Sequence, residues 1–184
     1  MIVLHSESEF KGERSVVALG MFDGVHIGHQ KLIRSAVQLA KDLHAVPVVC
    51  TFDRHPLSVI APEHAPEAVL TLDENLHKFE LLGAETAIVR PFTREFAAME
   101  PEKYLEMITR QLHIAAIVVG ENYTFGDHGR GNAEMIAQLA GKYGYLAKII
   151  PPVMIGNRMV SSTYIRELRR EKRFEEAEQL LKIQ

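Results

Sequence analysis

Two histidines, His26 and His29, stand three positions apart in the stretch LGMFDGVHIGHQKLI. Gly20, Gly24 and Gly28 surround them, and glycine allows tight turns and a close approach of the backbone to a ligand. An apolar run precedes the stretch and a helical pattern follows it, so both histidines lie where a strand passes into a helix. The free N–H groups of a helix start attract phosphate, and imidazoles beside it can donate hydrogen bonds to phosphate oxygens or become charged when an anion raises their pKa.

Metal binding and simple packing are the other roles open to His26 and His29. A zinc site needs a third ligand, and the sequence contains neither HExxH nor a dense cluster of ligand residues. On spacing alone a structural role would be the commoner one, but the glycines and the strand–loop–helix context argue against it. The motifs GxxxxGK[ST] and GxGxxG are absent, so the histidine pair would be the anchor of a bound nucleotide.

A second candidate for phosphate binding is the stretch RMVSSTYIRELR. Ser162 and Thr163 stand at a helix start, and Arg166, one turn later, can bind phosphate oxygens with its planar fork. Arg158 is a weaker candidate for the same cluster. The alternatives are that the serines and threonine only cap the helix and that Arg166 is a solvated helix residue.

A third candidate is the glycine-rich stretch GENYTFGDHGRG. Its Asn122 can both donate and accept hydrogen bonds, and Tyr123 and Phe125 offer flat apolar surfaces to a planar ring. Core packing is the alternative role for Phe125. Phe52 and His55 in TFDRHP are weaker candidates, and His55 has loop capping as its alternative role.

Strand and helix patterns alternate along the chain. Apolar runs predict strands at residues 15–22, 46–52, 86–92, 115–120 and 146–153. Helical periodicity predicts helices at 29–45, 71–83, 100–113, 132–144 and 162–183, with a capping box at Thr71 and Glu74 and a break near Lys172. This alternation predicts an α/β fold with a doubly wound parallel sheet, whose ligands bind beyond the carboxyl ends of the strands.

Composition limits the classes of protein to consider. The chain has 184 residues, of which 24% are charged, and we expect one domain, 1–184, with a helical tail at 163–184 packed on it. The net charge of −3 gives no footprint for nucleic acid, and no run of 18 apolar residues or signal peptide appears, so we expect no membrane association. Cys50, the single cysteine, excludes an internal disulfide framework; we interpret it as a core residue and expect a cytoplasmic protein.

Taken together, these stretches resemble the FMN adenylyltransferase module of prokaryotic FAD synthetases, within the HxGH nucleotidylyltransferase superfamily. GMFDGVHIGH resembles the HxGH signature, TFDRHP the second loop, VGENYTFGDHGRGN the flavin-side loop, and RMVSSTYIRELR the ISSTxxR motif. The four motifs occur in the family's order over nearly the entire chain. Two residues depart from the pattern: Lys172 stands where glycine is usual, and Asn75 where lysine is common.

The resemblance implies a Rossmann-like fold and the transfer of AMP from ATP to FMN, giving FAD and pyrophosphate. The FMN phosphate would attack the ATP α-phosphorus directly and in line. The implied catalytic residues are His26, His29, Ser162, Thr163 and Arg166. The implied ATP-binding residues are Gly20, Phe22, Asp23, Gly24, Gly28 and Arg158. The implied flavin-binding residues are Asn122, Phe125, Phe52 and Tyr123, with Asn122 expected on the opposite side from the phosphate cluster.

Mg²⁺ is expected with ATP, although the sequence does not assign its ligands. Asp23 is a candidate to hold the ion through water, and its alternative role is to cap the loop by accepting hydrogen bonds from nearby N–H groups.

Eighteen residues, Glu167 to Gln184, follow Arg166, so we expect no riboflavin kinase activity and a separate kinase as the source of FMN. Two other functions remain open. One is the same chemistry on another phosphorylated acceptor: pantetheine phosphate, nicotinamide mononucleotide or a polyol phosphate. The other is a flavin- or nucleotide-binding regulator without turnover, against which the full set of phosphate-binding residues argues.

Overall fold

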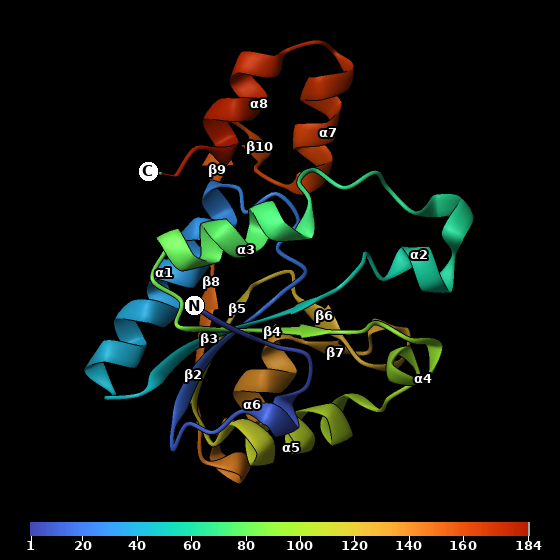
Figure 1. Ribbon diagram of the computed structural model, residues 1–184. Helices are drawn as coiled ribbons and strands as arrows, with labels where there is room; N and C mark the ends of the chain where they lie inside the picture. Colours follow the sequence, from blue (N-terminus) through green and yellow to red (C-terminus); the bar gives the residue numbers. More distant parts are fainter. Residues whose placement is uncertain (184) are drawn as a thin grey trace.

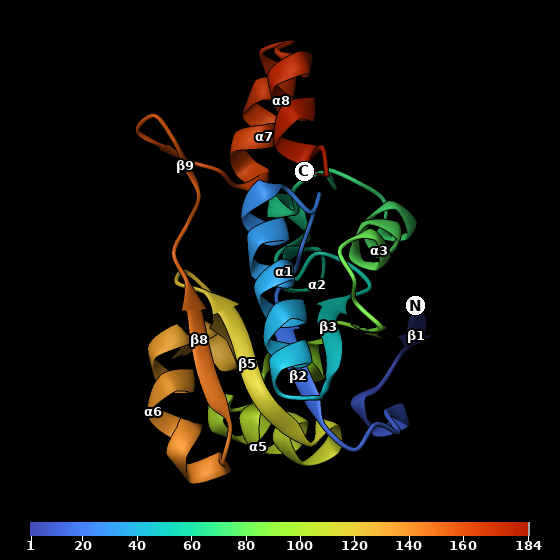
Figure 2. The same cartoon turned by 90° about the vertical axis from the view of Figure 1, so that its left-hand side faces the viewer.

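A six-stranded parallel sheet forms the centre of the computed structural model, which describes residues 1–183 (Figures 1 and 2). The strand order is β1-β4-β3-β2-β5-β8. The strands are β1 (Ile2–Leu4), β2 (Ser15–Leu19), β3 (Val46–Phe52), β4 (Thr86–Arg90), β5 (Ile114–Gly120) and β8 (Leu146–Ile150). The predicted parallel α/β fold is confirmed. The sequence analysis missed β1, a short edge strand that pairs with β4.

Helices cover both faces of the sheet, which makes three layers (Figure 2). On one face lie α1 (Ile27–Asp42) and α3 (Leu72–Leu81), and on the other α5 (Pro101–Leu112) and α6 (Ala133–Tyr143). Successive β2 side chains alternate between the two cores: Val16 and Ala18 pack toward α1, and Val17 and Leu19 toward α5 and α6. Because both faces are covered, β2 reads as an unbroken apolar run.

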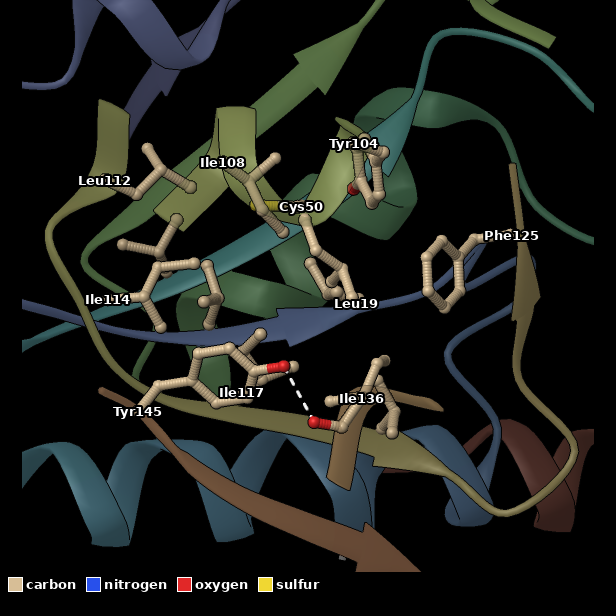
Figure 3. Close-up of a cluster of buried hydrophobic side chains, with 14 of the residues drawn as sticks. Leu19, Cys50, Tyr104, Ile108, Leu112, Ile114, Ile117, Phe125, Ile136 and Tyr145 are labelled. Carbon is tan, nitrogen blue, oxygen red and sulfur yellow. Dashed lines mark hydrogen bonds between the residues drawn. The ribbon is translucent and has the colours of Figure 1, made fainter. Parts of the chain in front are cut away.

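The core on the α5–α6 face is closed by aromatic and aliphatic side chains from several elements (Figure 3). The Tyr145 hydroxyl donates a hydrogen bond of 2.7 Å to the Ile136 carbonyl, which satisfies both buried polar groups. Cys50 is buried in the same cluster, as the sequence indicated, and burial raises the pKa of its thiol. No helix within residues 1–183 is long and apolar enough to cross a membrane.

A helical hairpin, α7 (Ser162–Arg170) and α8 (Phe174–Leu181), stands beyond the carboxyl ends of the strands (Figure 1). The predicted break near Lys172 therefore lies between two helices. The hairpin has its own apolar cluster, which includes Ile165, Leu168 and Leu181 and also Val69 from the segment before α3. Gln184, the last residue of the predicted tail, lies outside the described residues.

Short elements that the sequence pattern did not reveal occupy the connections. They are η1 (Glu7–Glu9), α2 (Leu57–Ile60), η2 (Pro62–His64), α4 (Arg94–Ala97), β6 (Thr124–Phe125), η3 (Asp127–Gly129), β7 (Gly131–Asn132), β9 (Met154–Ile155) and β10 (Arg158–Met159). Three predicted strands are shorter than expected and end at Leu19, Arg90 and Ile150. In the last of these, Pro151 and Pro152 follow directly, and proline has no N–H to continue a ladder.

Candidate active site

A cavity of about 300 Å³ opens at the carboxyl ends of β2 and β5. The strand order changes direction here, because the chain runs from β2 to β3 on one side while β5 flanks β2 on the other. Crevices at such switch points are the usual ligand sites of open parallel sheets. We call this space the polar cavity; it is lined by Met21, Asp23, His26, Gly28, His29, Leu32, His55, Gly120, Asn122, Ile150, Pro151, Pro152, Val153, Met159, Val160, Ser161, Ser162, Thr163 and Arg166.

The two histidines are stacked at the start of α1, with ring centroids 3.6 Å apart. His26 is the N-cap residue, and its Nδ1 accepts a hydrogen bond of 3.3 Å from the His29 backbone N–H. Neutral His26 therefore carries its proton on Nε2, which makes that atom a donor. The helix begins at Ile27, two residues before the predicted start at residue 29.

Burial keeps both imidazoles uncharged in the ligand-free protein. Desolvation lowers the pKa of His26 to about 4. Desolvation, followed by the neighbouring His26, lowers the pKa of His29 well below its ordinary value. Nδ1 of His29 is buried without a hydrogen-bond partner among the described residues, so this side chain has unused hydrogen-bonding capacity beside the cavity.

Each glycine of this loop is required for a different structural reason. A Cβ on Gly28 would lie 3.1 Å from Cε1 of His26, so a larger residue would press on the imidazole. Gly24 has φ +85°, and its N–H donates a 3.1 Å hydrogen bond to Oδ1 of buried Asn75. The atypical Asn75 thus anchors the loop. Gly28 lines the polar cavity, whereas Gly20 and Gly24 do not.

Phe22 also lies away from the cavity surface, although the resemblance implied an ATP contact. Its side chain is 1% exposed and meets the His29 ring edge-on at 5.3 Å. Its other ring neighbour is Phe79 of α3, at 5.6 Å. Phe22 therefore packs against the His29 ring inside the core. Its neighbour Met21, and not Phe22, lines the polar cavity.

Asp23 and Arg166 form a buried ion pair at the cavity wall. Oδ2 of Asp23 accepts from Nη2 of Arg166, while Oδ1 accepts a 2.8 Å hydrogen bond from the Val69 N–H. The Arg166 Nε donates to the Glu67 carbonyl at 2.6 Å. The alternative in which Arg166 is a solvated helix residue is therefore wrong, since its side chain is only 17% exposed. The backbone N–H that Asp23 accepts from belongs to the distant segment before α3 and not to its own loop, so the carboxylate joins two segments instead of capping one.

Each carboxylate oxygen of Asp23 already accepts one hydrogen bond, which the ion or its water would share. Within residues 1–183, no three His, Cys, Asp or Glu side chains cluster as a metal site would require.

Ser161, Ser162 and Thr163 have different contacts at the start of α7. Ser161 is the N-cap, and its Oγ accepts from the Tyr164 N–H at 3.1 Å. Ser162 donates its hydroxyl to the Asp23 carbonyl at 2.9 Å and so ties α7 to the first loop. Thr163 is exposed and faces the polar cavity. The chain therefore brings two helix starts, those of α1 and α7, to one cavity.

Two predicted residues lie elsewhere than expected. Asn122 is on the wall of the polar cavity together with His26 and His29, so the expectation that it lies opposite the phosphate cluster is wrong. The reason is that it lies only two residues after Gly120, the end of β5, at the switch point. Arg158 is outside the cavity wall: it pairs with Glu167, and its guanidinium lies 4.5 Å from the Tyr164 ring centroid.

A second cavity, of about 260 Å³, is walled by aromatic side chains. We call it the aromatic cavity; its rings are those of Phe52, Phe92, Phe96, Tyr104, Tyr123 and Phe125. Figure 3 shows Tyr104 and Phe125 on the same side of the adjoining core cluster. Three of the six rings were predicted, whereas Phe92, Phe96 and Tyr104 were missed because they come from β4–α5 segments without a recognisable motif.

Two segments of chain contribute to both cavities. Residues 120–125 supply Asn122 to the polar cavity and Tyr123 to the aromatic one, and residues 52–56 supply His55 and Phe52 in the same way. His55 is half-buried, and its Nδ1 accepts from the Leu57 N–H at 3.2 Å, which confirms the loop-capping role. The arrangement suits a ligand with an anionic end and a flat apolar end.

Comparison of the sequence with known proteins identifies related families and relatives. Residues 9–164 match the family model described as FAD synthetase. A bifunctional riboflavin kinase/FMN adenylyltransferase of Bacillus subtilis (strain 168) is 34% identical over 155 residues, which cover 83% of this chain and 48% of that protein. One from Listeria monocytogenes serovar 1/2a is 34% identical over 185 residues, 98% of this chain and 58% of the relative. The chain thus spans about half the length of these relatives.

Two solved structures have the same fold. A Streptococcus pneumoniae protein whose structure is titled macrolide-efflux protein superposes with a TM-score of 0.85 at 29% identity, covering 98% of this chain and 60% of that one. A pantoate-beta-alanine ligase from Francisella tularensis gives 0.55 at 14% identity, covering 98% and 86%, and supports the fold alone. The family model spans most of the chain, including the loops that line both cavities: the chain belongs to the FAD synthetase family.

Proposed function

We propose that this chain transfers AMP from ATP to FMN, giving FAD and pyrophosphate. The observation that carries the proposal is the pairing of two cavities. The polar cavity holds two helix starts, and the aromatic cavity shares the loops 52–56 and 120–125 with it. The first suits phosphates and the second suits a flat ring system. Membership of the FAD synthetase family supports the same substrates.

In the proposed reaction the FMN phosphate attacks the ATP α-phosphorus in line, and pyrophosphate leaves. The attacking group is already an anion, so no protein nucleophile or base is required. The protein aligns the two anions and stabilises the charge that develops on pyrophosphate. Mg²⁺ accompanying ATP, which reduces the charge on the phosphates, is part of this proposal.

The polar side chains of the cavity have separate tasks in this mechanism. Nε2 of His26 donates to a phosphate oxygen, since its Nδ1 is engaged by the His29 N–H. His29 adds a second imidazole with unused hydrogen-bonding capacity. Arg166 offers the donors that Asp23 and Glu67 leave unused, and Thr163 faces the same space. Asn122 then lies near the phosphates rather than at the far edge of the flavin ring.

Turnover tests the proposal directly. The purified chain, incubated with ATP, Mg²⁺ and FMN, should form FAD and pyrophosphate, which chromatography separates. Riboflavin lacks the attacking phosphate, so riboflavin and ATP should give no FAD at this site. Nicotinamide mononucleotide or pantetheine phosphate used in preference to FMN would favour the alternative acceptors, and binding of FMN without turnover would favour the regulator.

The role of the histidine pair has its own test. His29→Ala should lower kcat by a transition-state loss on the order of 2–4 kcal/mol, the scale for one charge-stabilising donor. FMN binding should change much less, because the ring lies in the aromatic cavity. His64→Ala, at a side chain that is 75% exposed, is the matched control. An unchanged kcat in a folded His29→Ala variant would return the pair to a structural role.

A further inference from the structure

A buried ion pair lies outside the polar cavity, between the N-terminal segment and β4. Glu7, in η1, is only 2% exposed, and Arg90 is the last residue of β4. Arg90 donates to both carboxylate oxygens: Nε to Oε1 at 3.0 Å, and Nη2 to Oε2. A buried pair of this kind adds little net stability compared with apolar side chains of the same size. Net stability alone is therefore a weak explanation for this pair.

The guanidinium of Arg90 reaches one wall of the aromatic cavity. Its Cζ lies 4.8 Å from the ring centroid of Phe96, within the range of a cation–π contact. Phe96 belongs to α4, a helix of four residues that are all partly or fully exposed. A single turn of this length has little stability of its own. The position of the Phe96 ring therefore depends on what packs against it.

Phe96 is the ring that joins the others. Its centroid lies 5.6 Å from that of Phe52, 5.7 Å from that of Phe92 and 5.6 Å from that of Tyr104. All four rings line the aromatic cavity. A shift of Phe96 would therefore change the shape of the space that these rings enclose.

We propose that Arg90, oriented by Glu7, is a positioning residue that holds Phe96 as a wall of the aromatic cavity and so sets the affinity for the planar ring of the acceptor. This inference rests on the proposed function and deepens it. Neither Arg90 nor Glu7 lines the polar cavity, so ATP binding does not depend on them. Riboflavin, which has the ring without the phosphate, depends on them in the same way as FMN.

The test is titration of the full chain with FMN, riboflavin and ATP separately. Glu7→Gln combined with Arg90→Met removes both charges at similar size, so no unpaired buried charge remains. We expect the Kd for FMN and for riboflavin to rise roughly tenfold as the cation–π contact and the ring position are lost, with the Kd for ATP unchanged. The matched control is Glu106→Gln with Arg110→Met, a surface ion pair on α5, which should change none of the three.

A double-mutant cycle separates positioning from simple stabilisation. Phe96→Leu should weaken FMN binding by itself, and adding the Glu7 and Arg90 substitutions should weaken it little further, because all three act through one ring. A lowered Tm with an unchanged Kd for FMN, or losses that add to those of Phe96→Leu, would overturn the inference. If the doubly substituted variant does not fold, Arg90→Lys takes its place, since it keeps the charge and loses the fork. The unsubstituted protein is measured first. If it neither binds FMN nor forms FAD, the proposed function itself fails, independently of Arg90.

Discussion

The chemistry of the polar cavity begins with two imidazoles that are neutral in the ligand-free protein. Burial lowers the pKa of both His26 and His29. They therefore act as hydrogen-bonding groups before a ligand arrives, and an anion beside them would raise their pKa values. The permanent positive charge of the cavity comes from Arg166, whose charge is balanced by Asp23. A bound phosphate would compete with Asp23 for that guanidinium.

The lowered pKa of His26 predicts how stability depends on pH. The pKa is about 4 in the folded protein, against the ordinary value of 6.5. As the pH falls below 6.5, the unfolded chain takes up this proton first, so the contribution of His26 to stability declines between pH 6.5 and 4 and then levels. The difference corresponds to about 3 kcal/mol for this group.

His26→Asn removes the titrating ring and keeps an acceptor at the helix N-cap. Urea unfolding of this variant at several pH values should show a smaller loss of stability on acidification than the unsubstituted protein shows. His64→Asn, at an exposed position, should keep the full loss. Equal losses in both variants would mean that burial of His26 does not govern this part of the pH profile.

At the scale of elements, the turn between α7 and α8 contains Lys172 in a backbone conformation that is unfavourable for a residue other than glycine. Lys172 has φ +61°, a left-handed conformation that suits glycine. The Lys172 N–H donates to the Arg169 carbonyl at 3.1 Å and the Arg173 N–H to the Leu168 carbonyl at 2.8 Å. These two bonds form the Schellman pattern that ends many helices, with Lys172 in the position where glycine is preferred.

Lys172→Gly should therefore stabilise the protein by about 1 kcal/mol, because it relieves the strain of a non-glycine residue with positive φ. The free energy of unfolding, measured in urea, tests this. Lys172→Ala keeps the Cβ and should show no such gain, which makes it the matched control. A loss of stability in Lys172→Gly would show that the Lys172 side chain contributes more than its backbone strain costs.

The elements of this fold were predictable in proportion to their length and burial. β2, β3 and β5 are buried on both faces and read directly from apolar runs. The capping box of α3, at Thr71 and Glu74, is present as predicted. β1 and α4 escaped notice because three or four partly exposed residues carry no periodic signal.

At the scale of the whole molecule, the site depends on contacts that no local pattern records. His26 and Arg166 stand in recognisable motifs, so their meeting at one cavity could be anticipated. The ring of Phe96 and its contact with Arg90 join separate elements, and no spacing in the sequence links them. Asn122 was placed on the wrong side because its motif gives its loop but not the direction in which that loop leaves β5.

The end of α8 is one of the places where the helical hairpin is attached to the sheet domain. Gln30, one residue after His29, is 1% exposed. Its Nε2 donates to the Val25 carbonyl at 3.0 Å and to the Lys182 carbonyl at 3.0 Å, and it lies 3.4 Å from the Leu181 carbonyl. Carbonyls at a helix end need such donors. The start of α1 and the end of α8 are thus joined by one side chain beside the candidate site.

Gln30→Leu keeps the size of this side chain and removes its donors, which takes this partner from the buried Val25 carbonyl and should cost about 1–3 kcal/mol of stability. Because α7 carries Thr163 and Arg166 into the polar cavity, looser docking of the hairpin should also weaken ATP binding more than FMN binding. Hydrogen exchange should show faster exchange in α8. Gln38→Leu, on the exposed side of the same helix, is the matched control. If both variants had the same stability and exchange rates, Gln30 would not hold the hairpin, and its other contacts, the apolar cluster around Leu168 and Leu181 and the bonds to Asp23, would carry that task.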